Sequence, residues 1–221
     1  ALEGVSLASP ILEDKVFLTY RDKSQVGLLK GVEDNYNQVI KIDSLMVSGN
    51  WFANAFDEVI IGGGLARNLS LGVYDYSDFL QLAAPKRKGS VGLGQNPLKN
   101  ETAVVAGIYF ANEEIDKKYL FAKIDLAQRL FQRKENEYTY IEIKANENPN
   151  LDFLEKEITS ILGQEVTVLN RVQLNKALYK MLNTENVAVY LIFSLIIIIA
   201  LFNVVGALIM MFLDKNPQLN I

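Results

Sequence analysis

The longest apolar stretch of the chain lies near its C-terminal end, at residues 187–213. Its 27 residues include no Asp, Glu, Lys, Arg, His or Pro, and Glu185 and Asp214 bracket it. At about 1.5 Å per residue such a helix is roughly 40 Å long, more than the roughly 30 Å hydrocarbon core of a bilayer. We therefore predict a transmembrane helix. The alternative is an unusually apolar core helix of a soluble domain.

The residues before this stretch have an amphipathic helical pattern. Apolar residues recur at helical spacing from Arg171 onward, and no Gly or Pro interrupts the pattern before Gly206. The pattern predicts one helix of about 45 residues, with a stalk at 171–186 that continues into the membrane at 187–213. Such a helix would carry motion rigidly from a soluble domain into the membrane.

The remainder of the chain alternates short β-type and helical patterns, which predicts an α+β domain. A hairpin is expected at 11–20 and 26–32. Glu58–Ile61 leads through three glycines into a helix, and 151–162 forms an apolar helical stripe that Gly163 ends. Asp125 and Gln128 suggest a capping box for a helix that ends at Phe131. Further strands are expected at 39–42, 45–52, 79–83, 102–110, 119–124, 138–144 and 166–169.

The glycine turn at 62–64 has two interpretations. A helix N-terminus after glycines offers free N–H groups to a phosphate. The segment has neither a GxGxxG nor a GxxxxGK[ST] pattern, however. We therefore favour, over nucleotide binding, a tight turn that lets two backbone segments pass close to one another.

A long polar loop is predicted at 85–101, between two strands. It contains two prolines and three glycines, and its basic residues outnumber Glu101 on an otherwise acidic chain. A loop of this length between strands is uncommon and tends to be functional or disordered. It is either a solvated surface loop or a docking loop. The candidate partner-binding residues are Pro85, Lys86, Arg87, Lys88, Asn96, Pro97, Leu98 and Lys99.

Composition excludes several classes of function. The chain has no Cys and no His, so it lacks thiol nucleophiles, thiolate metal sites and the commonest general base. Its formal net charge of −4 provides no global basic field for nucleic acid. We expect no catalytic residues, no metal and no cofactor. The first residues lack a signal-peptide pattern, and we expect a fragment of a longer membrane protein.

A stripe of small residues follows one side of the predicted membrane helix. It consists of Ala200, Asn203, Gly206 and Ala207, at spacings of three and four. Small residues let helices approach closely, and an intramembrane Asn seeks a polar partner. We predict a helix–helix interface here. The alternative is an Asn that is simply tolerated near the helix centre.

The C-terminal segment resembles the second transmembrane segment of FtsX-like or MacB-type ABC transporter permeases, most closely the lipoprotein-releasing Lol-type branch. The resemblance rests on Ala200–Asn203, on Leu208–Met211 and on Asp214-Lys215. Upstream, Leu28–Val32 and Glu58–Val73 resemble two further elements of the family. The resemblance covers almost the whole chain.

The resemblance implies a periplasmic domain made of a split α/β porter-like subdomain (1–32 and 135–170) and a β-rich, Sabre-like insert (33–134). It also implies that the loop is a hook that docks a periplasmic lipoprotein carrier. Residues 1–186 would be periplasmic in a bacterial inner membrane, and 214–221 would begin a cytoplasmic coupling segment at Asp214 and Lys215. The partners would be a cytoplasmic ABC ATPase, a second permease subunit in a homodimer or heterodimer, and the carrier or a lipoprotein.

Three functions remain open. The first is a non-catalytic, multi-pass permease that couples ATP hydrolysis on a separate subunit to periplasmic movement, by mechanotransmission, for lipoprotein release. The second is an FtsX- or MacB-type permease that binds a periplasmic hydrolase or an efflux adaptor. The third is a membrane-anchored binding domain without an ATPase.

Overall fold

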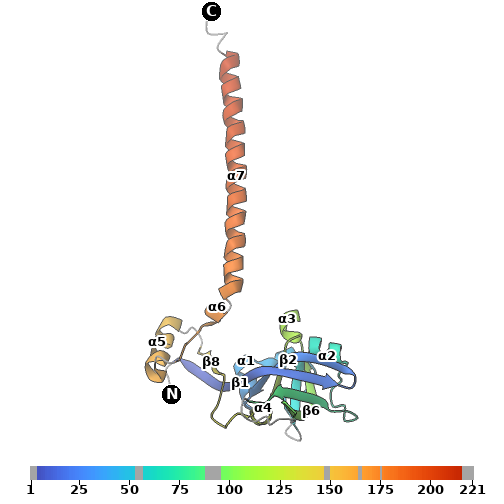
Figure 1. Cartoon of the computed structure of the whole chain (residues 1–221). Helices are drawn as coiled ribbons and strands as arrows, with labels where there is room; N and C mark the ends of the chain where they lie inside the picture. Colours follow the sequence, from blue (N-terminus) through green and yellow to red (C-terminus); the bar gives the residue numbers. More distant parts are fainter. Residues whose placement is uncertain are drawn as a thin grey trace, which may run out of the picture. The chain divides into compact units, whose positions relative to one another are not determined.

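The computed structural model describes residues 4–52, 57–87, 96–146, 150–163, 166–174 and 176–215 (Figure 1). At residues 152, 176–186, 188, 214 and 215 it describes the backbone only. The chain divides into two compact units, residues 1–149 and 150–221.

Unit 1 holds all the strands of the described chain and four short α-helices. The strands are β1 (Val5–Tyr20), β2 (Lys23–Val32), β3 (Met46–Gly49), β4 (Glu58–Gly62), β5 (Leu80–Pro85), β6 (Leu98–Tyr109), β7 (Tyr119–Lys123) and β8 (Tyr140–Ala145). The helices are α1 (Tyr36–Ile40), the 3₁₀ turn η1 (Ile42–Leu45), α2 (Gly63–Leu69), α3 (Glu113–Asp116) and α4 (Ile124–Phe131).

Six of the strands close into a ring. Hydrogen bonding follows the order β2-β7-β4-β6-β5-β1, and the hairpin pairing of β1 with β2 joins the two ends. The β2–β7 and β4–β6 pairs are parallel, and the other pairs are antiparallel. A closed ring leaves no free strand edge along its circumference, and a ring of this size is filled by its own side chains.

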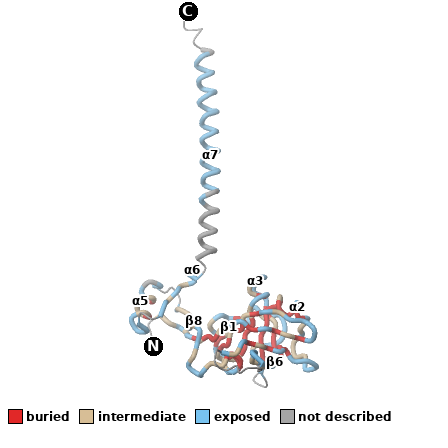
Figure 2. Tube along the Cα trace, viewed as in Figure 1, coloured by how far each residue is buried: buried red, intermediate tan, exposed pale blue. Residues whose placement is uncertain are grey.

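The main core fills this ring. Every one of the six strands contributes buried apolar residues to it, among them Leu18, Leu29, Ile61, Leu82 and Leu120. Leu126 and Leu130 of α4 join the same core, since the apolar stripe of that helix faces the strands. Figure 2 shows the buried residues concentrated in this part of the chain.

A second core lies around the aromatic residues Tyr36, Tyr109 and Phe121. The Tyr36 and Tyr109 ring centroids lie 5.9 and 5.5 Å from that of Phe121. This core packs α1 and η1 against the strands, and it includes Ile11 and Ile42.

A two-stranded ribbon continues from the ring. The first half of β1 pairs with β8, from Val5 opposite Ala145 to Ile11 opposite Tyr140. The second half of β1 pairs with β2 and β5 within the ring. β1 is therefore one strand that serves two structures, and the change comes at Ile11 and Leu12.

Unit 2 is helical. It comprises α5 (Leu151–Leu162), α6 (Arg171–Leu174) and the 40-residue α7 (Lys176–Lys215). The side chain of Asn150 accepts a hydrogen bond from the N–H of Phe153 and caps α5, and Gly163 follows its end. Helix is thus confirmed on both sides of Asn175, which itself lies outside the described residues.

Three of the predicted local structures are wrong. Residues 39–42 are not a strand, because α1 ends at Lys41 in a left-handed conformation and the next turn buries Ile42. α4 begins at Ile124 after Lys123, so Asp125 lies in the first turn and is not the cap. Residues 166–169 do not form a strand.

The α+β class is confirmed, whereas the division into a porter-like subdomain and an insert stays a prediction. The predicted porter-like part includes the hairpin at 11–32, and the structure places most of this hairpin in the ring with β5 and β7. By strand pairing, the ring section begins at Leu12 and the ribbon resumes at Tyr140.

Candidate functional site

The predicted docking loop is shorter than the sequence indicates. β5 and β6 pair up to Pro85 opposite Leu98, and the N–H of Lys86 donates to the carbonyl of Pro97 at 2.8 Å. The loop therefore spans residues 86–97. Pro85, Leu98 and Lys99 belong to strands, since their ladder with the opposite strand overrides the turn-like composition. Lys88 and the seven residues after it lie outside the described residues.

Arg87 anchors the start of this loop to the segment that follows α4. Its backbone N–H donates to Oε1 of Gln132 at 3.2 Å, and its Nη1 lies 3.0 Å from Oε2 of Glu137. Arg133 lies 3.7 Å from the same carboxylate oxygen. The positive charge of Arg87 is thus already paired with the chain's own Glu137.

Two more of the predicted docking residues have local partners. The side chain of Asn96 accepts from the N–H of Leu98 at 2.9 Å, and Lys99 pairs with Glu101 at 2.8 Å. Leu98 is 39% exposed, and Pro85 and Pro97 are exposed as well, so these three are the apolar docking candidates among the described residues of this set.

The glycine turn is a close crossing of two backbone segments, as the tight-turn interpretation predicts. A Cβ built on Gly62 would lie 2.4 Å from the carbonyl oxygen of Asp116. One on Gly63 would lie 2.1 Å from the ring of Phe110. Asp116, on α3, is itself buried. The close approach of α3 and Phe110 to these glycines favours the tight turn over a phosphate site at the start of α2.

A polar cluster, which we call the joint, lies where the ribbon meets the ring. Nζ of Lys30 lies 3.0 Å from Oε1 of Glu142 and 3.8 Å from Oε2 of Glu13. The hydroxyl of Tyr36 donates to Glu142 at 2.6 Å, and the hydroxyl of Tyr140 donates to Glu13. The side chains of Lys30, Glu13 and Glu142 are 17%, 19% and 27% exposed, so solvent screens the cluster weakly.

The joint keeps its tyrosines protonated. Burial raises the pKa of Tyr36 far above its ordinary value of 10.0, and the Glu142 carboxylate adds to the shift. Burial and the hydrogen bond to Glu13 raise the pKa of Tyr140 in the same way. Nζ of Lys30 also lies 5.4 and 5.6 Å from the ring centroids of Tyr119 and Tyr140.

Sequence reasoning misses the joint, because Glu13 looks like one of several solvated carboxylates. Strand alternation offers one signal, since Tyr140 and Glu142 lie on the same face of β8. The partners on β2 and α1 are more than 100 residues away in sequence from Glu142, at separations of 112 and 106. No local pattern connects them.

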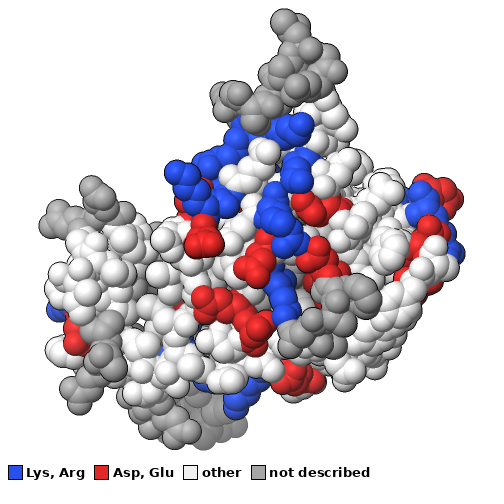
Figure 3. Space-filling model, turned by 90° about the horizontal axis from the view of Figure 1, so that it is seen from below, with Lys and Arg blue, Asp and Glu red and all other residues white. Residues whose placement is uncertain are grey.

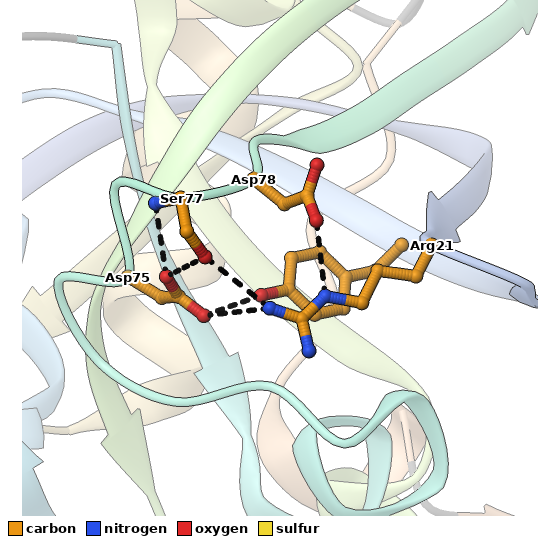
Figure 4. A network of polar contacts seen from close by, with 5 residues as sticks. Arg21, Asp75, Ser77 and Asp78 are labelled. Atoms are coloured by element: carbon orange, nitrogen blue, oxygen red, sulfur yellow. Dashed lines mark hydrogen bonds and ion pairs between the residues drawn. The ribbon is translucent and has the colours of Figure 1, made fainter.

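A second polar network fixes the turn between β1 and β2 (Figure 4). Arg21 lies there in a left-handed conformation, and its Nε donates to Asp78 at 3.0 Å. Its Nη2 lies 3.4 Å from Oδ2 of Asp75, which also accepts from the Tyr20 hydroxyl at 2.6 Å. Hydrogen bonds from Ser77 and then from Tyr20 lower the pKa of Asp75 to about 2. The network attaches the loop before β5 to the hairpin turn.

Charges of both signs lie next to one another on the surface. On the face shown in Figure 3, basic side chains border acidic ones, with no large region of a single sign. Among the residues that the structure describes, no cluster of three or more Asp or Glu side chains is arranged to hold a metal ion.

The membrane helix is confirmed by length and composition. Residues Val189–Leu213 of α7 form one apolar span of 25 residues with a mean hydropathy of 2.9, and none of its most apolar window is buried. Within unit 2 no other described element covers this span, as the membrane prediction requires. Ala200, Asn203, Gly206 and Ala207 are all exposed, and a Cβ on Gly206 would have nothing within 4 Å. Their role as an interface stays a prediction, as does the coupling role of Asp214 and Lys215.

Comparison with curated proteins finds relatives across the whole chain. The chain is 24% identical over 229 residues to "Lipoprotein-releasing system transmembrane protein LolC" of Buchnera aphidicola subsp. Schizaphis graminum. It is 23% identical over 217 residues to "Lipoprotein-releasing system transmembrane protein LolE" of Haemophilus influenzae. These alignments cover 100% and 96% of the chain but only 53% and 50% of the relatives, about half their length.

No protein-family model matches the chain. Among solved structures, it is similar to the extracellular domain of the noncanonic ABC-type transporter YknZ from Gram-positive bacteria (TM-score 0.49, 14% identity, 72% of this chain and 75% of that one). It is also similar to the periplasmic region of MacB from Actinobacillus actinomycetemcomitans (TM-score 0.48, 12% identity, 73% and 67%). TM-scores below 0.5 do not establish a shared fold. The two sequence alignments, which cover almost all of this chain, confirm the predicted resemblance to lipoprotein-releasing transmembrane proteins.

Proposed function

We propose that this chain is part of a permease subunit of an ABC transporter, in which a separate cytoplasmic ATPase drives movements that release lipoproteins from the inner membrane. One observation carries the proposal: two proteins named for lipoprotein release align with 100% and 96% of the chain, through the strand-rich unit and the membrane helix alike. The chain itself would be non-catalytic, because the ATPase would reside on another subunit.

In this proposal unit 1 lies in the periplasm and α7 crosses the inner membrane. Lys215, the last residue of α7, would mark the cytoplasmic end. In the full-length protein, further membrane helices would lie before Ala1 and after Ile221. The small-residue stripe at 200–207 would contact another membrane helix, from the same subunit or from a second one.

The loop at 86–97 is the proposed docking site for a periplasmic lipoprotein carrier. The contacts of Arg87 and Asn96 with their own chain assign these two residues to the base of the loop. Lys86, Leu98 and the two exposed prolines Pro85 and Pro97 then remain as the described residues of the set that would contact a partner. The carrier is one candidate occupant, and a hydrolase or an efflux adaptor would be captured instead if the second of the open functions holds.

Two experiments test this proposal. A photo-crosslinker placed at Lys86 or Leu98 of the full-length protein should capture a lipoprotein carrier, and the same probe at Asp22, on the hairpin turn, serves as the control. A flexible Gly-Ser insertion between α6 and α7 should abolish lipoprotein release while the complex still assembles with its ATPase. Release that persists despite the insertion contradicts transmission through this helix.

A further inference from the structure

The ribbon is the covalent connection between the ring and the remainder of the chain. Residues 12–139, which form the ring and its helices, lie in sequence between the two ribbon strands. The first residues of the chain lead into β1 at Val5, and the residues after β8 lead on to α5, α6 and α7. Any displacement that travels along the chain from the membrane helix enters the ring through β8 and β1.

The root of the ribbon is held by hydrogen bonds as well as by the joint. Thr139 donates its N–H to the carbonyl of Ile11 at 2.8 Å, and its Oγ1 accepts from the N–H of Glu13 at 2.9 Å. The joint adds contacts to β2 through Lys30 and to α1 through Tyr36. Four elements therefore meet at this point, whereas further out β8 pairs only with β1 among the described strands and contacts α1 through the hydrogen bond from Lys144 to the carbonyl of Gln38.

The charges of the joint are arranged so that Lys30 is indispensable. The ammonium lies between two carboxylates, Glu142 on ribbon strand β8 and Glu13 on the ring section of β1, directly opposite Lys30 in the β1–β2 hairpin. Each tyrosine hydroxyl already donates to one of these carboxylates and carries no charge, so the tyrosines do not replace the ammonium of Lys30. Without Lys30, the partly buried carboxylates of Glu13 and Glu142 would lose their shared cation, and removal of one partner from such a group is strongly destabilising.

We propose that the joint locks the angle between the ribbon and the ring, so that displacement of β8 moves the ring as one body. This inference rests on the proposed function for the source of the displacement. The locking itself is a property of unit 1 alone. If the end of the ribbon next to the ring were flexible, displacement of β8 would bend the ribbon there. With that end held by the joint, the same displacement moves the ring.

The first test measures the ribbon angle directly. Residues 1–221 contain no Cys, so cysteines introduced at Ser6 on the ribbon and Asp22 on the hairpin turn are the labelling sites in this part of the protein, and any Cys elsewhere in the full-length protein is replaced first. Both positions are exposed. In the full-length protein, Lys30→Met should broaden the measured distance distribution. Arg129→Met removes the ion pair with Asp57 on the ring, away from the joint, and should leave it narrow.

A distribution for Lys30→Met as narrow as that of the unmutated protein overturns the inference, as does equal broadening by Arg129→Met. If Lys30→Met does not fold, a double variant with Tyr36→Phe and Tyr140→Phe replaces it, because it removes only two hydroxyls. That variant should broaden the distribution too. Amide hydrogen exchange at Tyr140–Ala145 should become about tenfold faster in either variant, with β4 unchanged.

The second test distinguishes this inference from the proposed function. With the ATPase in proteoliposomes, Lys30→Met should hydrolyse ATP normally but release lipoprotein about tenfold more slowly. A broadened distance distribution with unchanged release shows that load does not pass through the joint, and it overturns the inference while the proposed function stands. Absence of ATP-dependent release by the unmutated protein overturns the proposed function, and the distance measurement still decides whether the joint locks the ribbon.

Discussion

The crossing at Gly62 offers a sharp stability prediction. An alanine Cβ there would lie 2.4, 2.7 and 2.8 Å from the O, Cα and C atoms of Asp116. These are backbone atoms, so no side-chain rotation relieves the clash, and α3 must move. Overpacking of this kind costs about 1–3 kcal/mol. Replacing Gly by Ala also reduces the conformational entropy of the unfolded chain, which offsets this cost by about 0.4–1 kcal/mol. We expect Gly62→Ala to lower the free energy of unfolding by about 1–2 kcal/mol.

Gly72 provides the matched control. A Cβ there would have nothing within 4 Å, and its φ lies outside the left-handed region. Gly72→Ala should therefore leave stability unchanged or raise it by up to about 1 kcal/mol. Urea unfolding of both variants in the same detergent checks the difference. Equal midpoints for the two variants would show that the glycine turn is not a close crossing, and a phosphate site would again be open.

Further contacts predict the effects of pH and of single substitutions. Because the pKa of Asp75 is lowered from 3.8 to about 2 in the folded protein, Asp75 stabilises the fold above pH 4, and this stabilisation is lost as the pH falls from about 4 through 2. NMR titration of the Asp75 carboxyl group should show the lowered pKa, and Asp75→Asn should remove this pH dependence of stability. Because the pKa values of Tyr36 and Tyr140 are raised in the folded protein, their contribution to stability is fully present below pH 10.0 and is lost as the pH rises further. Tyrosine absorbance, which reports ionisation, and ellipticity, which reports unfolding, should therefore change together. Glu137→Ala should change the free energy of unfolding by less than about 1 kcal/mol in a thermal unfolding assay, because the ion pairs of Glu137 are half-exposed. The same substitution should lower the crosslinking yield from Lys86, because it removes the carboxylate that holds the neighbouring Arg87. Leu130→Ala, in the main core, should cost about 2–5 kcal/mol in the same unfolding assay.

Elements defined by local pattern could be predicted from the sequence. The apolar run at 187–213 predicts the span that the structure places at Val189–Leu213. The hairpin, the strand at Glu58–Gly62 with its helix, and α5 with its glycine end follow from periodicity and turn residues. Each of these depends on residues within about 20 positions of one another, the range in which hydrophobic periodicity and capping act.

Features that depend on distant residues could not be predicted. Closure of the ring joins β2 with β7 and β1 with β5, and β-branched composition does not specify partners. The predicted end of the docking loop is wrong because Leu98 and Lys99 look like loop residues until the opposite strand is known. α1 replaces a predicted strand since burial of Tyr36 and Ile42 outweighs the local preference of Val39 and Ile40.

ATP-driven release in a reconstituted system is the decisive measurement for the proposed function. The full-length protein, its ATPase and any second permease subunit would be placed in proteoliposomes with a lipoprotein, and the soluble carrier would be added outside. The proposed function predicts transfer of the lipoprotein to the carrier that requires ATP hydrolysis and stops when a flexible insertion separates α6 from α7. Transfer that proceeds without ATP, or that is unaffected by the insertion, would contradict it.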